Sequence, residues 1–157
     1  MIDGCLELLR FYIPGGIVVK WDGPLTSRFI RADVNQMYQM LMNLCVNAAH
    51  AMENGGELKI SLTETELDAD SVPPGCEEDE ICPGLYVRLE VSDTGAGIDQ
   101  ATLERIFEPL LIAKEFQEGI GLGLPVVQRI IKNHGGLITI ESTSGEKTTF
   151  VVHLPCT

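Results

Sequence analysis

The chain has 157 residues, of which 45% are hydrophobic, and a formal net charge of −12. This length and composition fit one domain with a substantial core. The apolar runs are broken before the ~20 positions of a membrane span, no signal peptide opens the chain, and the acidic charge disfavours nucleic-acid binding. The five cysteines form no Cys-x-x-Cys pair, which disfavours disulfide and zinc frameworks and favours a cytoplasmic setting.

The first half of the chain predicts two short strands followed by a long helix. Strands are expected at 17–21 and 29–32. Asp33 and Gln36 resemble a capping box at the start of the helix, and a Gly-Gly pair after Met52 predicts its end. Helical spacing assigns these side chains to the sheet-facing stripe: Val34, Met37, Leu41, Leu44, Ala48 and Met52.

The second half predicts four more elements around an acidic segment. Alternating strands at 58–62 and 85–91 flank residues 64–82, which we interpret as a solvated acidic loop, with a docking surface for a basic partner as the alternative. A helix at 124–133 and strands at 137–141 and 148–154 follow. The expected fold is an α+β two-layer sandwich, a mixed and mostly antiparallel sheet of about five strands with about three helices on one face.

A second stripe of the long helix carries neutral polar side chains: Gln36, Gln39, Asn43, Asn47 and His50. An amide offers a hard oxygen to Mg²⁺ without changing the charge, and Mg²⁺ takes few protein ligands when phosphates are present. Asn47 is therefore a candidate metal ligand. The alternative is that these amides only bond neighbouring backbone groups.

Two glycine-containing blocks follow the polar helix. Asp93 ends a predicted strand and precedes Thr94-Gly95-Ala96-Gly97, where a carboxylate could accept a hydrogen bond from an amine such as that of adenine. An ordinary turn is the alternative. Gly119 to Leu124 leads into a helix, whose free amides favour an anion, although glycines also occur there for packing. The two commonest nucleotide-binding glycine motifs are missing from the sequence.

In this order the blocks resemble the ATP-binding catalytic domain of sensor histidine kinases, in the superfamily of the gyrase and MutL ATPases. Asn43–Met52 is similar to the N box, Asp93–Ile98 to the G1 box, Ile106–Pro109 to the F box and Gly119–Leu124 to the G2 box. The tail from Lys132 is similar to nitrogen-regulation-type and PAS-linked hybrid sensors. The resemblance implies a Bergerat-type ATP-binding fold over 1–157.

The resemblance also implies roles for single residues. Asn47 would coordinate Mg²⁺, Asn43 would position the γ-phosphate or its acceptor, and His50 would approach a phosphate. Asp93 would bind the adenine amine, in a pocket shaped by Gly95, Gly97 and Ile98, with Thr149 as its polar partner. His134 matches a helix cap and not a catalytic group.

The phosphates are expected to contact the G2 box and a mobile lid at about 107–120. The implied phosphate-binding residues are Lys114, Gly119, Gly121, Leu122, Gly123 and Leu124. The lid departs from the family pattern, because Ile112, Ala113 and Ile120 stand where hydroxyl side chains are usual. This departure leaves a degenerate nucleotide-binding scaffold as an alternative, and a serine-directed kinase or ATPase of the same superfamily is another.

The implied function is to bind Mg-ATP and to donate the γ-phosphoryl group to a histidine on separate dimerisation helices of the parent kinase. A response regulator receiver domain is the implied downstream partner, and no nucleic-acid partner is expected. Because the acceptor helices do not match any part of 1–157, we expect the isolated chain to be a monomer that does not phosphorylate itself. Membrane anchorage of the parent is left open.

Overall fold

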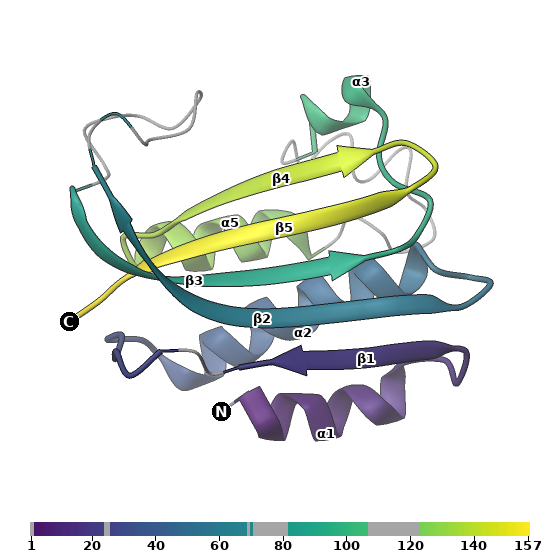
Figure 1. Cartoon of the computed structure of the whole chain (residues 1–157), viewed down its shortest axis with the longest axis horizontal. Coiled ribbons are helices and arrows are strands. Elements are labelled where there is room, and N and C mark those ends of the chain that lie inside the picture. The colour runs from purple at the N-terminus through teal and green to yellow at the C-terminus, as the bar shows by residue number, and fades with distance from the viewer. Residues whose placement is uncertain (1, 24–25, 69, 71–81, 107–122) are drawn as a thin grey trace.

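The computed structural model describes residues 2–23, 26–68, 70, 82–106 and 123–157. It contains a five-stranded sheet in the order β1-β2-β3-β5-β4 (Figure 1). The elements in chain order are α1 (Ile2–Tyr12), β1 (Ile17–Asp22), α2 (Val34–His50), β2 (Gly56–Leu67), β3 (Gly84–Asp93), α3 (Gln100–Leu103), α5 (Leu124–Asn133), β4 (Leu137–Thr143) and β5 (Lys147–Pro155). Among the helices of these ranges, none has the length and apolar character needed to cross a membrane.

The sheet is mixed. Strand β1 runs parallel to β2, and every other neighbouring pair is antiparallel. A parallel pair requires a crossover connection, which α2 provides. Helices α2 and α5 lie behind the sheet in Figure 1, and α1, α2 and α5 all contribute buried side chains to the same core. The predicted α+β two-layer sandwich is confirmed.

Helix α2 is the central element of the helical layer. Asp33 is its N-cap and accepts a hydrogen bond from the backbone N–H of Gln36 at 3.0 Å, as predicted. The predicted inward stripe is buried at Met37, Leu41, Leu44, Ala48 and Met52. Val34 is the exception, with 57% of its surface exposed, because the first residue of the helix lies beyond the core.

Two predicted segments differ from the structure. Residues 29–32 do not form a strand. Ile30 makes one isolated bridge with Cys156, and Phe29 is 80% exposed. The segment therefore makes a single bridge and not the ladder of pairs that defines a strand. The predicted acidic loop begins too early, because β2 continues to Leu67. Glu64 therefore lies on a strand, where Thr26 donates a hydrogen bond to its carboxylate at 2.6 Å.

Helices α1 and α3 were not predicted. Helix α1 buries Cys5 and Leu9 at a spacing of four residues, which is an amphipathic signal in a short segment. Helix α3 is a single turn with Asp99 as its N-cap, and the carboxylate of Asp99 accepts a hydrogen bond from the backbone N–H of Thr102 at 2.9 Å. Such a turn carries too little pattern to be assigned from sequence.

Candidate functional site

A cavity of about 560 Å³ lies where α2 and β3 end, toward the right-hand end of the sheet in Figure 1. Its walls come from the turn after α2, the loop after β3, the start of α5 and strand β5. Seven predicted site residues line this cavity: Asn47, His50, Asp93, Gly95, Gly97, Ile98 and Leu124. The blocks that resemble the N, G1 and G2 boxes therefore meet at one cavity. The G2 box reaches it through its last residue, Leu124.

Asn47 is the most informative side chain of the cavity. It lies in the last turn of α2 with 6% of its surface exposed. Its Nδ2 atom is buried and has no hydrogen-bond partner within the described structure. A buried polar group without a partner costs roughly 1–3 kcal/mol. A polar ligand in the cavity would offset this cost, so Asn47 is placed to bind one.

The carboxylate of Asp93 lines the same cavity from the end of β3. Only 2% of the residue is exposed, and its Oδ1 atom accepts a hydrogen bond from the backbone N–H of Gly95 at 2.8 Å. Burial raises the pKa of Asp93, and the bond from Gly95 only partly opposes this effect. A buried carboxylate at a cavity wall is a strong acceptor for an N–H group of a ligand.

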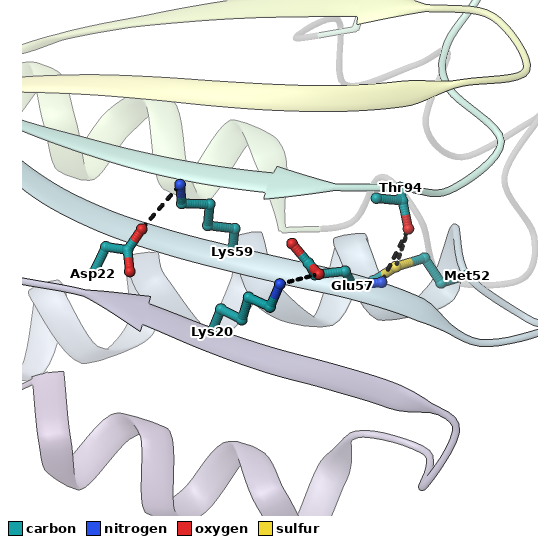
Figure 2. A network of polar contacts seen from close by, with 6 residues as sticks. All are labelled: Lys20, Asp22, Met52, Glu57, Lys59 and Thr94. Atoms are coloured by element: carbon teal, nitrogen blue, oxygen red, sulfur yellow. Dashed lines mark hydrogen bonds and ion pairs between the residues drawn. The ribbon is translucent and has the colours of Figure 1, made fainter.

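Thr94 fastens the loop after β3 to β2. Its backbone N–H donates to the carbonyl of Glu57 at 3.2 Å, and its Oγ1 atom accepts from the N–H of Glu57 at 3.0 Å. The hydroxyl also lies 3.9 Å from the sulfur of Met52. Figure 2 shows the two contacts of the Thr94 hydroxyl next to the exposed ion pair between Lys20 and Glu57. The protein itself therefore holds the backbone that follows Asp93.

Two glycines allow this loop to approach its neighbours closely. A Cβ atom at Gly95 would lie 2.5 Å from the carbonyl oxygen of Ala51, which accepts a hydrogen bond from Ala96. Gly97 has a φ of +70°, and a Cβ atom there would overlap the carbonyl of Thr143. Both glycines are required by the path of the backbone along the cavity wall.

Asn43 and Gly123 do not line the cavity. Asn43 is half-buried on α2, and a Cβ atom on Gly123 would lie 2.8 Å from its Cγ atom. Since Gly123 is the N-cap of α5, Asn43 faces the start of that helix, one turn from Asn47. The remaining predicted phosphate contacts lie outside the described residues: Lys114, Gly119, Gly121 and Leu122.

The prediction that Thr149 is the polar partner of Asp93 is wrong by one residue. The Oγ1 atom of Thr149 lies 2.8 Å from the hydroxyl of Ser92, on the other face of the sheet. Thr148 is the residue opposite Asp93 in the β3–β5 register, and it lines the cavity. Successive side chains of a strand point to opposite faces, so an offset of one residue reverses the assignment.

Sequence analysis also missed the apolar wall. Met52, Ile106 and Phe150 line the cavity and are 2%, 6% and 3% exposed. The alternation along β5 was a usable signal, because Thr148 and Phe150 share one face. Helical spacing predicted that Met52 is buried but not that it lines the cavity, and Ile106 gave no signal at all. Each follows a helix and is brought to the cavity only by the tertiary fold.

His134 caps α5, as predicted. Its Nε2 atom accepts a hydrogen bond from the backbone N–H of Asp33 at 3.1 Å, and its Nδ1 atom lies 2.7 Å from the carbonyl of Ile130. Because Nε2 accepts, Nδ1 carries the proton and donates to that carbonyl. The imidazole therefore joins the end of α5 to the start of α2, away from the cavity.

The fold and the cavity define the class of protein. The two-layer sandwich with a buried asparagine on one helix and a buried aspartate at a strand end matches the class that the family comparison gives. The chain belongs to the family of histidine kinase-, DNA gyrase B- and HSP90-like ATPases, whose model matches residues 32–157.

Three similar curated proteins are named as kinases, two of them as sensor kinases. Sensor kinase CckA of Brucella abortus is 41% identical over 80% of this chain. Sporulation kinase A of Bacillus subtilis and sensor histidine kinase ZraS of Salmonella typhimurium are each 35% identical, over 89% and 88% of this chain. The matched region is 13%, 20% and 26% of the length of these relatives, so this chain corresponds to a minor part of each.

Solved structures give the same assignment. The catalytic domain of histidine kinase ThkA, in a nucleotide-free form, superposes with a TM-score of 0.74 at 25% identity, covering 98% of this chain and 89% of that one. Full-length ShkA in complex with AMPPNP has a TM-score of 0.64 at 26% identity, and the match covers 99% of this chain and 30% of ShkA. The chain is therefore similar over nearly its whole length to histidine kinase catalytic domains.

Proposed function

We propose that this chain binds Mg-ATP and donates the γ-phosphoryl group to a histidine on a separate dimerisation domain, as the catalytic part of a two-component sensor kinase. The observation that carries the proposal is the convergence of Asn47 and Asp93 on one cavity. Asn47 has a buried amide nitrogen without a partner, and Asp93 has a buried carboxylate. Two separated polar groups suit a ligand with a base at one end and phosphates at the other.

The arrangement supports one orientation of the nucleotide. Asp93 would accept the exocyclic amine of adenine, because an ionised carboxylate only accepts hydrogen bonds. The phosphates would lie toward Asn47 and Leu124, where the first turn of α5 contains no acidic residue and its backbone amides favour an anion. Apolar surface for the base is available from Met52, Ile106 and Phe150.

Asn47 fits a magnesium ion that is held chiefly by the nucleotide. In the described part of the chain, no cluster of three or more histidine, cysteine or acidic side chains could hold a metal. Mg²⁺ bound with a nucleotide usually takes only one or two protein ligands. A flip of the Asn47 amide exchanges its nitrogen and oxygen, so the oxygen can face the cavity. When bound, Mg²⁺ would neutralise charge on the phosphates.

The proposal extends to partners outside this chain. The acceptor histidine would be supplied by dimerisation helices of the parent kinase, and the phosphoryl group would pass to a response regulator receiver domain. The sensor-kinase names of CckA and ZraS support this role. We further propose that the isolated chain is a monomer, acts in the cytoplasm and does not phosphorylate itself.

Calorimetric titration of Mg-ATP into the chain tests nucleotide binding. We expect one saturable site that is lost in the variants Asn47→Leu and Asp93→Asn. Thr149→Val is the matched control, because Thr149 lies beside Asp93's partner strand position but faces the other side of the sheet. Equal loss in Thr149→Val, or unchanged binding in Asp93→Asn, would contradict the assignment.

Phosphoryl transfer requires a second test. The chain is mixed with Mg-ATP and a purified dimerisation domain of a sensor kinase, and labelled phosphate is followed on that domain. Acid-labile label would indicate phosphohistidine, whereas acid-stable label would indicate the serine-directed alternative. Binding of ATP without transfer to any acceptor would favour the degenerate scaffold, the reading suggested by Ile112, Ala113 and Ile120 in the sequence.

A further inference from the structure

We infer that the other end of the sandwich contains a binding site for a small, uncharged aromatic molecule. A second cavity, of about 280 Å³, lies where α2 begins and where β5 ends, toward the left-hand end of the sheet in Figure 1. Among the described residues, it shares no lining side chain with the nucleotide cavity. The two cavities therefore lie at opposite ends of the same helix.

The wall of the second cavity is apolar. Met37, Met40 and Leu41 line it from α2, each with 1–2% of its surface exposed. Leu89 and Trp21 face them from the sheet. Methionine sulfur makes favourable contacts with aromatic rings, and its flexible side chain adapts to the shape of a ligand. The wall is therefore suited to a flat apolar molecule rather than to a polar one.

The cavity is open to solvent at its rim and is large enough for a small ring compound. For comparison, an apolar cavity of about 150 Å³ in another protein binds benzene. The cavity of about 280 Å³ found here would admit a bicyclic molecule of the size of indole. We therefore assign one or two fused rings as the ligand class.

Hydrogen bonds hold the rim of the cavity open. The segment 26–30 crosses between β1 and α2, and its Thr26 and Ser27 donate to Glu64 at 2.6 and 3.0 Å. At its other end the carbonyl of Phe29 accepts from the N–H of Thr157 at 3.0 Å. Because this segment is fixed at both ends, it does not collapse into the apolar space behind it.

The charges at the rim disfavour an ionic ligand. Of the described lining residues, Asp3 and Arg28 carry charge, and their opposite signs leave no net charge at the opening. Both side chains are exposed to water, and Arg28 also approaches Glu64 at 3.7 Å. A neutral aromatic molecule with one N–H group could donate a hydrogen bond to the carboxylate of Asp3 at this rim. Indole is neutral, has one N–H group and is the probe we choose.

Methionine methyl NMR can test both cavities in one experiment. The whole chain is labelled with ¹³C at its methionine methyl groups, and indole is titrated in. Met37 and Met40 line the apolar cavity, while Met52 lines the nucleotide cavity and serves as an internal control. We expect saturable shifts of Met37 and Met40 with Met52 unchanged, and the reverse pattern on titration with a non-hydrolysable ATP analogue. Shifts of Met52 by indole, or no saturable shift, would overturn the inference.

A filling variant tests the cavity itself. Leu62 lines the cavity from β2, so Leu62→Phe places a ring inside it, and Leu62→Met is the volume-matched control. We expect indole to bind at least about tenfold more weakly to Leu62→Phe, a loss typical of a blocked apolar site, and normally to Leu62→Met. Equal binding by both folded variants would contradict the site. If Leu62→Phe does not fold, Overhauser contacts between indole and the Met37 and Met40 methyls of the unmodified chain decide the question, and their absence would refute the site.

Discussion

The two ends of α2 border cavities of opposite character, although both are built against the same face of the same sheet. Where the helix ends, Asn47 has an unpartnered amide nitrogen and Asp93 a buried carboxylate. Where it begins, the wall of the cavity is apolar, and Asp33 and Glu64 beside it already accept hydrogen bonds from the protein. A buried polar group without a protein partner, such as the Asn47 amide nitrogen, therefore marks the cavity that suits a polar ligand.

The largest effect is expected from Gly97→Ala, which should disrupt the nucleotide cavity and not the apolar cavity. The new Cβ atom would overlap the carbonyl of Thr143 at a φ of +70°, so we expect a loss of about 3 kcal/mol or more of stability together with nucleotide binding. Gly145→Ala is the control, because its φ is also positive but the space around it is open, and about 1 kcal/mol is expected. Thermal unfolding measures the stability of the two variants, and calorimetry measures their nucleotide affinity. Similar losses of stability in Gly97→Ala and Gly145→Ala would show that the backbone moves to relieve the clash with Thr143.

Asn47→Leu should remove the unpartnered polar group from the nucleotide cavity and leave its wall more apolar. The substitution removes a buried amide without a partner, so we expect stability to stay the same or to rise, while ATP affinity falls by roughly 100-fold. Met40→Leu, at the other end of α2, is the control and should leave ATP affinity unchanged. A large fall in Tm for Asn47→Leu would show that the amide is satisfied in the unliganded protein.

Asp93→Asn tests the electrostatic cost of the polar end. Burial raises the pKa of Asp93, so the stability that this group contributes is fully present below its unfolded pKa and is lost as the pH rises through its folded pKa. We therefore expect Asp93→Asn to raise the Tm by a few degrees near neutral pH and to have less effect in acid. Unfolding curves of both proteins across this range check the sign. A Tm lowered at neutral pH would mean that the carboxylate has stabilising partners.

The smallest effect is expected at the apolar end. Glu64→Gln weakens the solvent-exposed hydrogen bonds that fix Thr26 and Ser27, and we expect only a small fall in Tm with no change in ATP affinity. Lys59→Gln removes an exposed ion pair with Asp22 on the neighbouring strand and should lower the Tm even less, because water and salt screen such a pair. A change of ATP affinity in Glu64→Gln would show that the two ends are not independent.

Much of the fold was predictable because its signals are local. The capping interaction of Asp33 and the buried stripe that includes Leu41 and Leu44 follow from helical spacing within α2. The polar site was also predictable in part, since Asn47 and Asp93 each lie in a block of distinctive sequence and both reach the cavity. These features depend on residues that are neighbours in the chain.

The errors concern features that only tertiary structure decides. Thr148 replaces Thr149 at the cavity because strand register determines which face a side chain occupies. Strand β2 extends through Glu64, although the acidic composition from this residue onward favours a loop. Segment 26–30, from a distant part of the chain, provides the hydrogen-bond donors that hold the Glu64 carboxylate. The apolar cavity was not predictable at all, since composition specifies that side chains are buried and not how completely they fill the space between elements.

The position of β5 in the sheet has a consequence for biosynthesis. The last strand of the sequence is inserted between β3 and β4 and is not added at an edge. Thr148, which completes the cavity wall opposite Asp93, therefore arrives after every other element has been made. A nascent chain that has emerged only to residue 143 has neither a continuous sheet nor a complete cavity. Capture of nucleotide by a growing chain would thus report that strand β5 has been made and has paired with β3.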